Sequence, residues 1–262
     1  MPEGHTIHRI ARDHTRDYVG QVLQTSSPQG RFRKEARILN GLKLEAVDAW
    51  GKHLFYRWEG KHRLHIHLGL YGKFKTKTLP VPAPLGAVRL RLTGQSKAFD
   101  LHGPNTCELI DDQQWENITS RLGADPLRKD ADVESVWNRI SNSRAAIGTL
   151  LLNQSIIAGV GNVYRAEVLH ILGIHPERQG RELTRDEFNT MWKLIVSLLK
   201  IGVKHNRIIT SEPADIGKPR RQMSQDERLQ VYKHSPCQKC DTEIESWTVG
   251  ARTIYAWTNC QT

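Results

Sequence analysis

Apolar and polar residues alternate in two segments of the first half of the chain. Between positions 64 and 70 apolar residues alternate with polar residues or glycine, and between 88 and 92 they alternate with arginine. A period of two is typical of strands with one buried face. Proline and glycine interrupt the chain at 80–86 and 103–104. We therefore predict an antiparallel sheet or sandwich over residues 20–111.

A helical period is found at the start of the chain and in its second half. The apolar residues of segment 6–18 fall on one helical face, with Thr6 as the candidate N-cap. After residues 122–126 the sequence becomes a polar, charged link, and the helical pattern resumes at Ser141. Three elements are predicted there: a helix over 145–154, a glycine-containing turn over 155–161 and a helix over 162–172.

The remainder of the chain combines one strong helix with less regular segments. Thr184 followed by Glu187 is a capping-box pattern that opens a third helix. Residues 212–228 contain two prolines, many charges and little apolar periodicity, so we predict a mobile loop. Residues 249–252 are typical of a hairpin turn in the C-terminal tail.

Composition narrows the class of protein. The 262 residues include 38 Lys and Arg against 28 Asp and Glu, and this net charge of +10 indicates a polyanionic partner such as nucleic acid or an anionic membrane. A hydrophobic fraction of 38% excludes wholesale disorder, and the length excludes a short disulfide scaffold. No secretory signal is found at the N-terminus, so we expect a cytoplasmic protein that is not anchored in a membrane.

The N-terminus carries a candidate nucleophile. Pro2 directly follows Met1, and removal of Met1 would expose a secondary amine. Such an amine attacks the anomeric carbon of a sugar and forms a Schiff base, with Glu3 beside it as acid or base. From these residues alone, the alternative interpretation is a solvated chain start without a function.

The glycine-bearing turn over 158–162 is a second candidate site. Backbone amides at a helix N-terminus bind phosphate oxygens, and paired glycines allow a close approach. The pattern lacks the third glycine of a dinucleotide fingerprint and follows a helix instead of a strand. A plain helix–helix turn explains these residues equally well.

A third candidate is a metal site formed by three cysteines near the C-terminus: Cys237, Cys240 and Cys260. A zinc ribbon uses two Cys-x-x-Cys pairs, but Trp257 replaces the first cysteine of the second pair. His234 or, less favourably, Asp241 would supply the fourth ligand. The alternative is a finger without metal in which Trp257 belongs to the core. Both interpretations stay open, and a disulfide is less favoured in a reducing cell.

Together these features resemble the formamidopyrimidine-DNA glycosylase and endonuclease VIII family, and in particular its endonuclease VIII branch of the actinobacterial type. The resemblance covers nearly the whole chain and depends on the order and spacing of several motifs. These are Met1-Pro2-Glu3-Gly4, Gly51-Lys52-His53-Leu54, His67-Leu68-Gly69-Leu70-Tyr71-Gly72, Leu122-Gly123-Ala124-Asp125-Pro126, Asn153-Gln154, Ala158-Gly159-Val160-Gly161-Asn162 and the cysteine-bearing tail with Arg252.

The resemblance implies an α+β fold in three parts. These are an N-terminal β-sandwich fronted by the catalytic helix (1–123), a helix-two-turn-helix DNA-binding domain (124–230) and a C-terminal β-hairpin finger with an intact or degenerate zinc site (231–262). Duplex DNA would lie in a basic cleft, with the damaged nucleotide extruded into a pocket. The positive charge would then serve phosphate binding.

The resemblance also implies the catalytic residues. Pro2 would attack C1′ of the sugar, Glu3 would assist ring opening and later proton transfers, and Lys52 would contact phosphate or sugar near the reaction centre. The β- and δ-eliminations that follow would cut the strand, and they require no cofactor. For Lys52 the alternative is a surface lysine beside a strand.

DNA contacts are implied in both halves of the chain. Asn162 and Arg252 match the phosphate contacts of the family. Leu70 and Tyr71 match a loop that enters the duplex where the base has left, although Leu70 could instead belong to the core. The Leu-Tyr pair fits the endonuclease VIII branch better than the purine-specific branch, which favours methionine there.

Three positions depart from the family pattern. Thr6 replaces a second N-terminal glutamate, so more of the acid–base work would fall on Glu3. Trp257 replaces the third zinc cysteine and weakens the case for a metal. Gly69 replaces a glutamine that is common in bacterial endonuclease VIII, so we expect weaker discrimination of the opposite base.

We therefore predict a bifunctional DNA glycosylase and abasic-site lyase that excises oxidised pyrimidines in base excision repair. Its expected partner is damaged duplex DNA, and we expect a monomer. The alternatives are a glycosylase for oxidised purines such as formamidopyrimidine and oxoguanine, a catalytically silent damaged-DNA-binding protein, and a protein that binds unrelated RNA.

Overall fold

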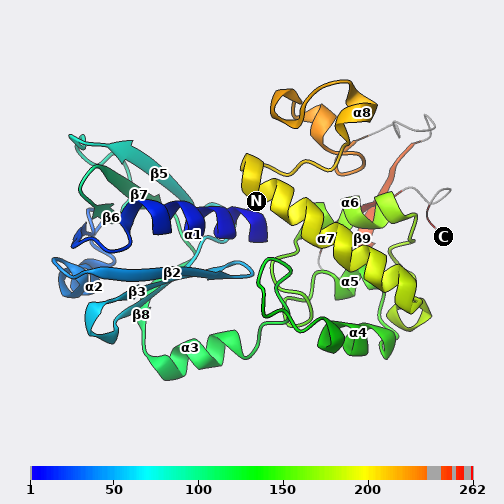
Figure 1. The fold of residues 1–262 in the computed structure, drawn as a ribbon, viewed down its shortest axis with the longest axis horizontal. Helices are drawn as coiled ribbons and strands as arrows, with labels where there is room; N and C mark the ends of the chain where they lie inside the picture. Colours follow the sequence, from blue (N-terminus) through cyan, green and yellow to red (C-terminus); the bar gives the residue numbers. More distant parts are fainter. Residues whose placement is uncertain (1, 235–242, 250–251, 257–260, 262) are drawn as a thin grey trace. The chain divides into compact units, whose positions relative to one another are not determined.

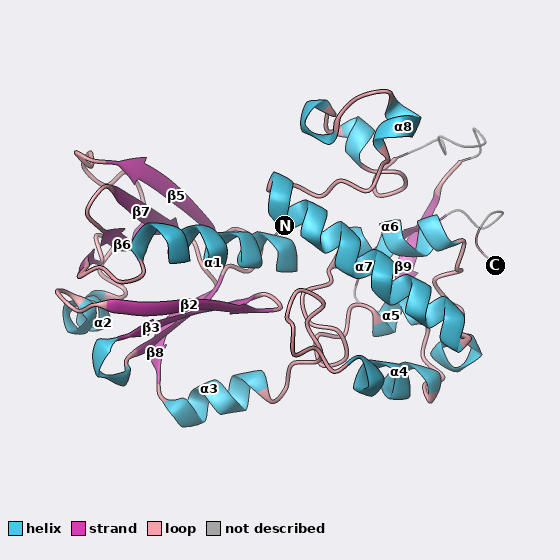
Figure 2. Cartoon of the chain, in the orientation of Figure 1, coloured by secondary structure: helices cyan, strands magenta, loops and turns pink. Residues whose placement is uncertain are grey.

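The computed structural model describes residues 2–234, 243–249, 252–256 and 261. The chain divides into two compact units, one formed by Met1–Glu3 with Ile7–Ser120 and the other by Gly4–Thr6 with Arg121–Thr262. Strands dominate the first unit and helices the second, as Figure 2 shows. This confirms the predicted change from a β-rich to a helical half.

The first unit contains two antiparallel four-stranded sheets with the strand orders β1-β6-β7-β5 and β2-β3-β4-β8. The strands are β1 (Gln24–Ser26), β2 (Leu44–Trp50), β3 (His53–Trp58), β4 (Arg63–His67), β5 (Lys73–Thr78), β6 (Val88–Thr93), β7 (Lys97–His102) and β8 (Thr106–Ile110). Helices α2 (Arg33–Leu39) and α3 (Asp112–Thr119) complete the unit. The alternation over 88–92 corresponds to β6, and that over 64–70 corresponds to β4 as far as His67, after which the chain turns.

Helix α1 (Gly4–Tyr18) lies between the two sheets of this unit, as Figure 1 shows. Its apolar face belongs to the same hydrophobic core as strand residues from both sheets. His14 connects the layers, because its Nδ1 is 2.6 Å from Tyr56 Oη in β3 and its ring stacks on Phe99 in β7 at a centroid distance of 4.6 Å. The core thus fixes the axis of the helix whose first residues follow Pro2 and Glu3.

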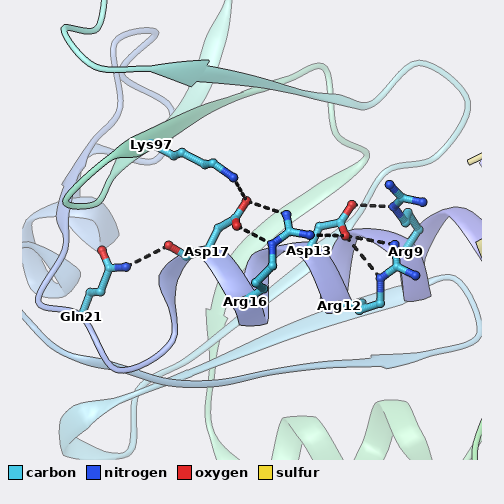
Figure 3. A network of polar contacts seen from close by, with 7 residues as sticks. All are labelled: Arg9, Arg12, Asp13, Arg16, Asp17, Gln21 and Lys97. Carbon is cyan, nitrogen blue, oxygen red and sulfur yellow. Dashed lines mark hydrogen bonds and ion pairs between the residues drawn. The ribbon is translucent and has the colours of Figure 1, made fainter. Parts of the chain in front are cut away.

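Charged residues on the other face of α1 form a polar network with Gln21, which follows the helix, and with Lys97 of β7, as Figure 3 shows: Arg9, Arg12, Asp13, Arg16 and Asp17. Arg16 Nε donates to Asp17 at 2.7 Å, and Lys97 Nζ in β7 donates to the same carboxylate at 2.9 Å. The Arg16 and Lys97 cations lower the pKa of Asp17 to about 2. Asp17 therefore stays ionised near neutral pH and ties the end of α1 to the sheet.

The second unit is built around α6 (Asn162–Leu172) and α7 (Arg185–His205), accompanied by α4 (Val133–Ser141), α5 (Ile147–Leu150) and α8 (Pro213–Ile216). Helix α6 has the predicted bounds. Helix α7 begins with the predicted capping box, in which Thr184 Oγ1 accepts from Glu187 N at 3.2 Å and Glu187 Oε2 accepts from Thr184 N at 2.7 Å. The predicted helix over 145–154 is reduced to α5.

The structure adds short helices to two segments that the sequence predicts to be irregular. The polar link before Ser141 contains α4, which begins after the N-cap Asp132 and buries only Val136 and Ile140. The segment 212–228 contains α8 and two 3-10 turns, Arg220–Gln222 and Asp226–Arg228. Short helices with one narrow apolar stripe give too weak a period to be recognised among charged residues.

A buried carboxylate joins the ends of that segment to α6. Glu167 is fully buried and accepts a hydrogen bond from the Thr210 hydroxyl. It also accepts three backbone N–H groups at 2.8, 2.9 and 2.8 Å, those of Gln230, Val231 and Tyr232. These donors satisfy the buried carboxylate. The start of the C-terminal tail is thereby fixed to the helical unit.

The tail ends in an antiparallel hairpin of β9 (Glu245–Val249) and β10 (Arg252–Ala256), with Val249 opposite Arg252. This confirms the predicted hairpin. Ile254 is buried in the core of the helical unit. In the described part of the chain, no helix has the length and apolar character needed to span a membrane.

Candidate active site

The candidate nucleophile and its neighbour lie immediately before α1. Pro2 is half-buried, and Glu3 is fully buried as the N-cap residue, with φ −117° and ψ −179°. The helix begins at Gly4, so the prediction of Thr6 as the N-cap is wrong. The Glu3 side chain makes no capping hydrogen bond to the helix. Its carboxyl group is therefore not used to close the helix end beside the Pro2 nitrogen.

Gly4 in the first turn of α1 packs closely against Gly159 of the helical unit. Gly4 N donates to Gly159 O at 2.8 Å, and a Cβ on Gly4 would lie 2.9 Å from Gly159 Cα. Gly159 has φ +95°, which favours glycine. Gln154 holds this turn, because its Oε1 accepts from Gly159 N at 3.0 Å and its Nε2 donates to Val160 O at 2.9 Å. The glycine-bearing turn therefore packs directly against Gly4, the first residue of α1.

His5 packs the same turn against two helices. It is 4% exposed, and its ring lies edge-on to Tyr164 of α6 at a centroid distance of 5.4 Å. Gly202 of α7 lies so close to these two rings that no larger residue fits there. A Cβ on Gly202 would lie 2.8 Å from His5 Cγ and 2.3 Å from Tyr164 Oη. Burial lowers the pKa of His5 to about 4, so the ring is neutral at pH 7.

Lys52 lies in the tight turn between β2 and β3. Trp50 and His53 pair across this turn, and Gly51 has φ +58°. Lys52 is half-buried, and its charge adds to the effect of burial in lowering the pKa of His53 and His67. The lysine therefore stands at a histidine-rich end of the sheet.

Leu70 and Tyr71 project from a closed turn that follows β4. They are 56% and 80% exposed, so the alternative that Leu70 belongs to the core is wrong. Gly72 N donates to Leu68 O at 3.0 Å, and a Cβ on Gly72 would lie 2.3 Å from that oxygen. Only glycine closes this turn. The turn therefore holds two large side chains in solvent.

Asn162 and Arg165 of α6 and the hairpin residue Thr253 belong to one hydrogen-bonded group. Asn162 Nδ2 donates to Thr253 O at 2.9 Å, while Arg165 Nη2 donates to the same oxygen at 3.1 Å and to Asn162 Oδ1 at 2.5 Å. Asn162 and Arg165 are buried, whereas Arg252 is exposed. The Asn162 amide therefore holds the hairpin that presents Arg252.

Most of the predicted metal ligands lie outside the described residues: Cys237, Cys240, Asp241 and Cys260, together with Trp257. His234 is described and half-buried. Among the residues that the structure describes, no group of three His, Cys, Asp or Glu side chains is arranged to hold a metal ion. Zinc in the finger therefore stays a prediction.

Sequence reasoning missed Arg165 and Glu167, which are both fully buried in α6. The sequence does contain a signal for these two residues, because they lie in a predicted helix that has apolar residues on all its faces, which indicates a buried helix. Charged residues within such a helix must be paired, and their partners come from distant segments. His5 was missed because its environment depends on α6 and α7.

Comparisons with known proteins define the class of this fold and site. The formamidopyrimidine-DNA glycosylase N-terminal domain model matches residues 1–106, and the formamidopyrimidine-DNA glycosylase H2TH domain model matches residues 122–213. The chain belongs to the formamidopyrimidine-DNA glycosylase family. This membership confirms the resemblance and the predicted class of enzyme, a DNA glycosylase.

Individual relatives agree with the predicted branch. Endonuclease 8 1 of Mycobacterium tuberculosis (strain H37Rv) is 44% identical over 269 residues, which covers all of both chains. A formamidopyrimidine-DNA glycosylase of Chloroflexus aurantiacus is 30% identical and covers 100% of this chain and 98% of its own. A solved complex of the LlFpg protein with a THF-DNA and an inhibitor has a TM-score of 0.80 at 25% identity and full coverage of both chains. A Lactococcus lactis Fpg bound to abasic-site DNA shares the fold, with a TM-score of 0.81, 24% identity and 99% coverage of each chain.

Proposed function

We propose that the chain is a bifunctional DNA glycosylase and abasic-site lyase that removes oxidised pyrimidines from damaged duplex DNA in base excision repair. The observation that carries the proposal is the start of α1, where Pro2 precedes a fully buried Glu3. The similarity to Endonuclease 8 1 and to a protein solved with a THF-DNA supports it. The exposed Leu70 and Tyr71 supply a surface suited to an opened duplex.

The reaction begins when the Pro2 amine, exposed by removal of Met1, attacks C1′ of the damaged nucleotide. The new C1′–N bond replaces the glycosidic bond, whose electron pair leaves with the base, and the base takes up the proton that the attacking amine loses. The Glu3 carboxyl group gives its proton to the ring oxygen O4′, and the opened sugar becomes an iminium, the protonated Schiff base. Lys52 places a positive charge beside phosphate or sugar at this centre.

Strand cleavage follows from the iminium. Loss of a C2′ proton shifts an electron pair toward the iminium and breaks the C3′–O bond, and a second elimination breaks the C5′–O bond. Water then hydrolyses the remaining C–N double bond and regenerates the amine. Leu70 and Tyr71 fill the space that the extruded nucleotide leaves, while Arg252 and Asn162 contact phosphates.

The substrate is tested by cleavage of matched duplexes that contain an oxidised pyrimidine, oxoguanine or no lesion. The proposal expects faster cleavage of the oxidised-pyrimidine duplex. Preferred cleavage of oxoguanine would identify a purine-specific enzyme. Binding without cleavage of any duplex, or of abasic DNA, would instead identify a silent damage-binding protein, and tight RNA binding without cleavage of abasic DNA an RNA-binding one.

Gly202→Ala should lower cleavage about 10- to 100-fold in a protein that stays folded, because displacement of a reacting group by about 1 Å costs about that much. The added Cβ would lie 2.3 Å from Tyr164 Oη and 2.8 Å from His5 Cγ, so the first turn of α1 must move. Single-turnover cleavage, measured beside circular dichroism, checks the result.

The matched control adds Tyr164→Phe to Gly202→Ala, which removes the closest atom. Part of the cleavage rate should return in this double variant. Full activity of Gly202→Ala alone would show that the packing around His5 does not position the N-terminus.

Arg252→Ala should weaken DNA binding by about 1 to 3 kcal/mol, the range for hydrogen bonds to charged groups. Arg252 is exposed at the start of β10, so the loss should come from the DNA contact and not from unfolding. Binding titrations at several salt concentrations should also show that the slope of log K against log salt concentration is smaller in magnitude by about one. Arg252→Lys, which keeps the charge, should retain most of the affinity, and unchanged binding by the alanine variant would exclude the contact.

The finger should contain zinc at about one ion per chain if Cys237, Cys240, Cys260 and His234 form a four-ligand site. Elemental analysis of the purified protein measures this ratio. His234→Ala should then lower the zinc content. Active protein free of zinc would establish the alternative, a finger that is stabilised without metal.

A further inference from the structure

Three polar side chains form a hydrogen-bonded series across neighbouring strands of the first unit. His53 lies in β3, His65 in β4 and Glu108 in β8, and the register places His65 directly opposite Glu108. His53 Nδ1 is 2.9 Å from His65 Nε2, and His65 Nδ1 is 3.1 Å from Glu108 Oε1. The two rings are stacked, with 5.2 Å between their centroids. The series ends at the residue that follows Lys52.

The carboxylate of Glu108 determines which atom donates in each hydrogen bond of the series. An ionised carboxylate only accepts hydrogen bonds, so His65 must donate from Nδ1. Burial lowers the pKa of His65 and keeps the ring neutral at pH 7, which makes its Nε2 an acceptor. His53 must therefore donate from Nδ1, and its Nε2 is left as an acceptor.

The ring of His53 is also held by its other neighbours. It lies parallel to Phe55 at a centroid distance of 6.3 Å and faces His67 at 5.0 Å. Burial, with the charges of its neighbours, lowers the pKa of His53 to about 3, so no second proton is bound near neutral pH. A neutral ring does not repel the Lys52 ammonium group, whereas an imidazolium would.

We propose that His53 is a positioning residue for Lys52, and that Glu108 and His65 fix its ring orientation and tautomer. The backbone supports this assignment, since His53 pairs with Trp50 across the turn that carries Lys52. The inference rests on the role of Lys52 in the proposed function. Glu108 acts at a distance from the reaction, through two rings and one turn.

The first test removes the terminal acceptor. Glu108→Leu changes a side chain that is 53% exposed, so folding should be retained. The single-turnover rate of base excision should fall about 10-fold, the order expected for a misplaced group, while DNA affinity stays unchanged. Glu45→Leu, an exposed glutamate of β2, is the matched control and should leave the rate unchanged. His65→Phe keeps a stacked ring without its nitrogens and should reproduce the loss.

The second test asks whether the loss is transmitted through Lys52. In a Lys52→Met background, Glu108→Leu should not lower the single-turnover rate any further, because the lysine that Glu108 helps to position is absent. Additive losses would overturn the inference. A normal rate in Lys52→Met alone would instead refute the role of Lys52 in the proposed function.

The tautomer gives a readout that is independent of activity. Nitrogen-15 NMR of the histidine side chains should show hydrogen on Nδ1 of His53 and none on Nε2, and this preference should be lost in Glu108→Leu. Hydrogen on Nε2 in the unaltered protein, or a tautomer that does not respond to Glu108→Leu, would overturn the inference whatever the role of Lys52.

Discussion

Glu3→Gln should abolish most base excision, with a loss of about 100- to 10,000-fold, while DNA binding changes little. Glu3 is fully buried next to Pro2, and the proposed function assigns its carboxyl group to proton transfer. Glutamine keeps the size and the hydrogen-bonding groups of the side chain but cannot transfer a proton to the sugar ring. The rate of release of an oxidised pyrimidine and the Kd for the same duplex measure the two effects separately.

A preformed abasic site sharpens this comparison. Abasic DNA has already lost its base and is in equilibrium with the ring-opened aldehyde, with which the amine reacts without protonation of O4′, so the Glu3→Gln variant should lose less activity on it than on a base lesion. Glu45→Gln changes an exposed glutamate and is the control for the substitution itself. Equal losses of binding and excision would contradict the role assigned to Glu3.

Acidification from pH 7 to pH 5 should cost about 4 kcal/mol of folding free energy through two buried histidines, His5 and His14, at about 2 kcal/mol each. Burial lowers the pKa of His5 to about 4 and that of His14 to about 3. Below about pH 6.5, the ordinary pKa of histidine, these two rings are protonated in the unfolded chain but not in the folded chain. The stabilisation is therefore complete above that pH and is lost as the pH falls toward the folded pKa values.

Urea unfolding at pH 7 and pH 5 measures this loss, and His14 provides the matched variants. His14→Gln removes the titrating ring, so the difference between the two pH values should shrink by about 2 kcal/mol. Tyr56→Phe removes only the partner of the 2.6 Å hydrogen bond and should lower stability at both pH values while leaving the difference unchanged. An undiminished pH dependence in His14→Gln would contradict this account.

Elements with one strong period could be predicted from the sequence alone. β4, β6, α6 and α7 each combine regular apolar spacing with clear end signals; α6 has the predicted bounds, α7 begins at the predicted capping box, and β4 ends three residues before the alternation does. Helix α4 was missed because charged residues cover its exposed side, although Asp132 before Val133 is an N-cap signal that could have revealed it.

The site was predictable where it depends on chain order and not where it depends on long-range contacts. Pro2 and Glu3 are adjacent in the chain, so the sequence alone suffices to propose their chemistry. The first turn of α1 requires Gly202 to leave space for His5, and residues so far apart in the chain show no shared pattern. The series from Glu108 to His53 likewise depends on the register of three strands.

Trapping with borohydride tests the central claim most directly. Borohydride reduces the iminium between the Pro2 nitrogen and C1′ to a stable amine, so Met1-processed protein should form a covalent adduct with DNA that carries an abasic site or an oxidised pyrimidine. Pro2→Ala would still present an amine after Met1 removal, so it tests the need for the proline ring. The decisive control is a chain with an N-terminal extension that places the Pro2 nitrogen in a peptide bond.

The account predicts an adduct whose DNA is attached to the N-terminal peptide of the processed protein, and no adduct for the extended chain. An adduct that persists in the extended chain would locate the nucleophile elsewhere. Intact DNA binding without any adduct would contradict the amine mechanism and identify a protein that binds damage without cutting it.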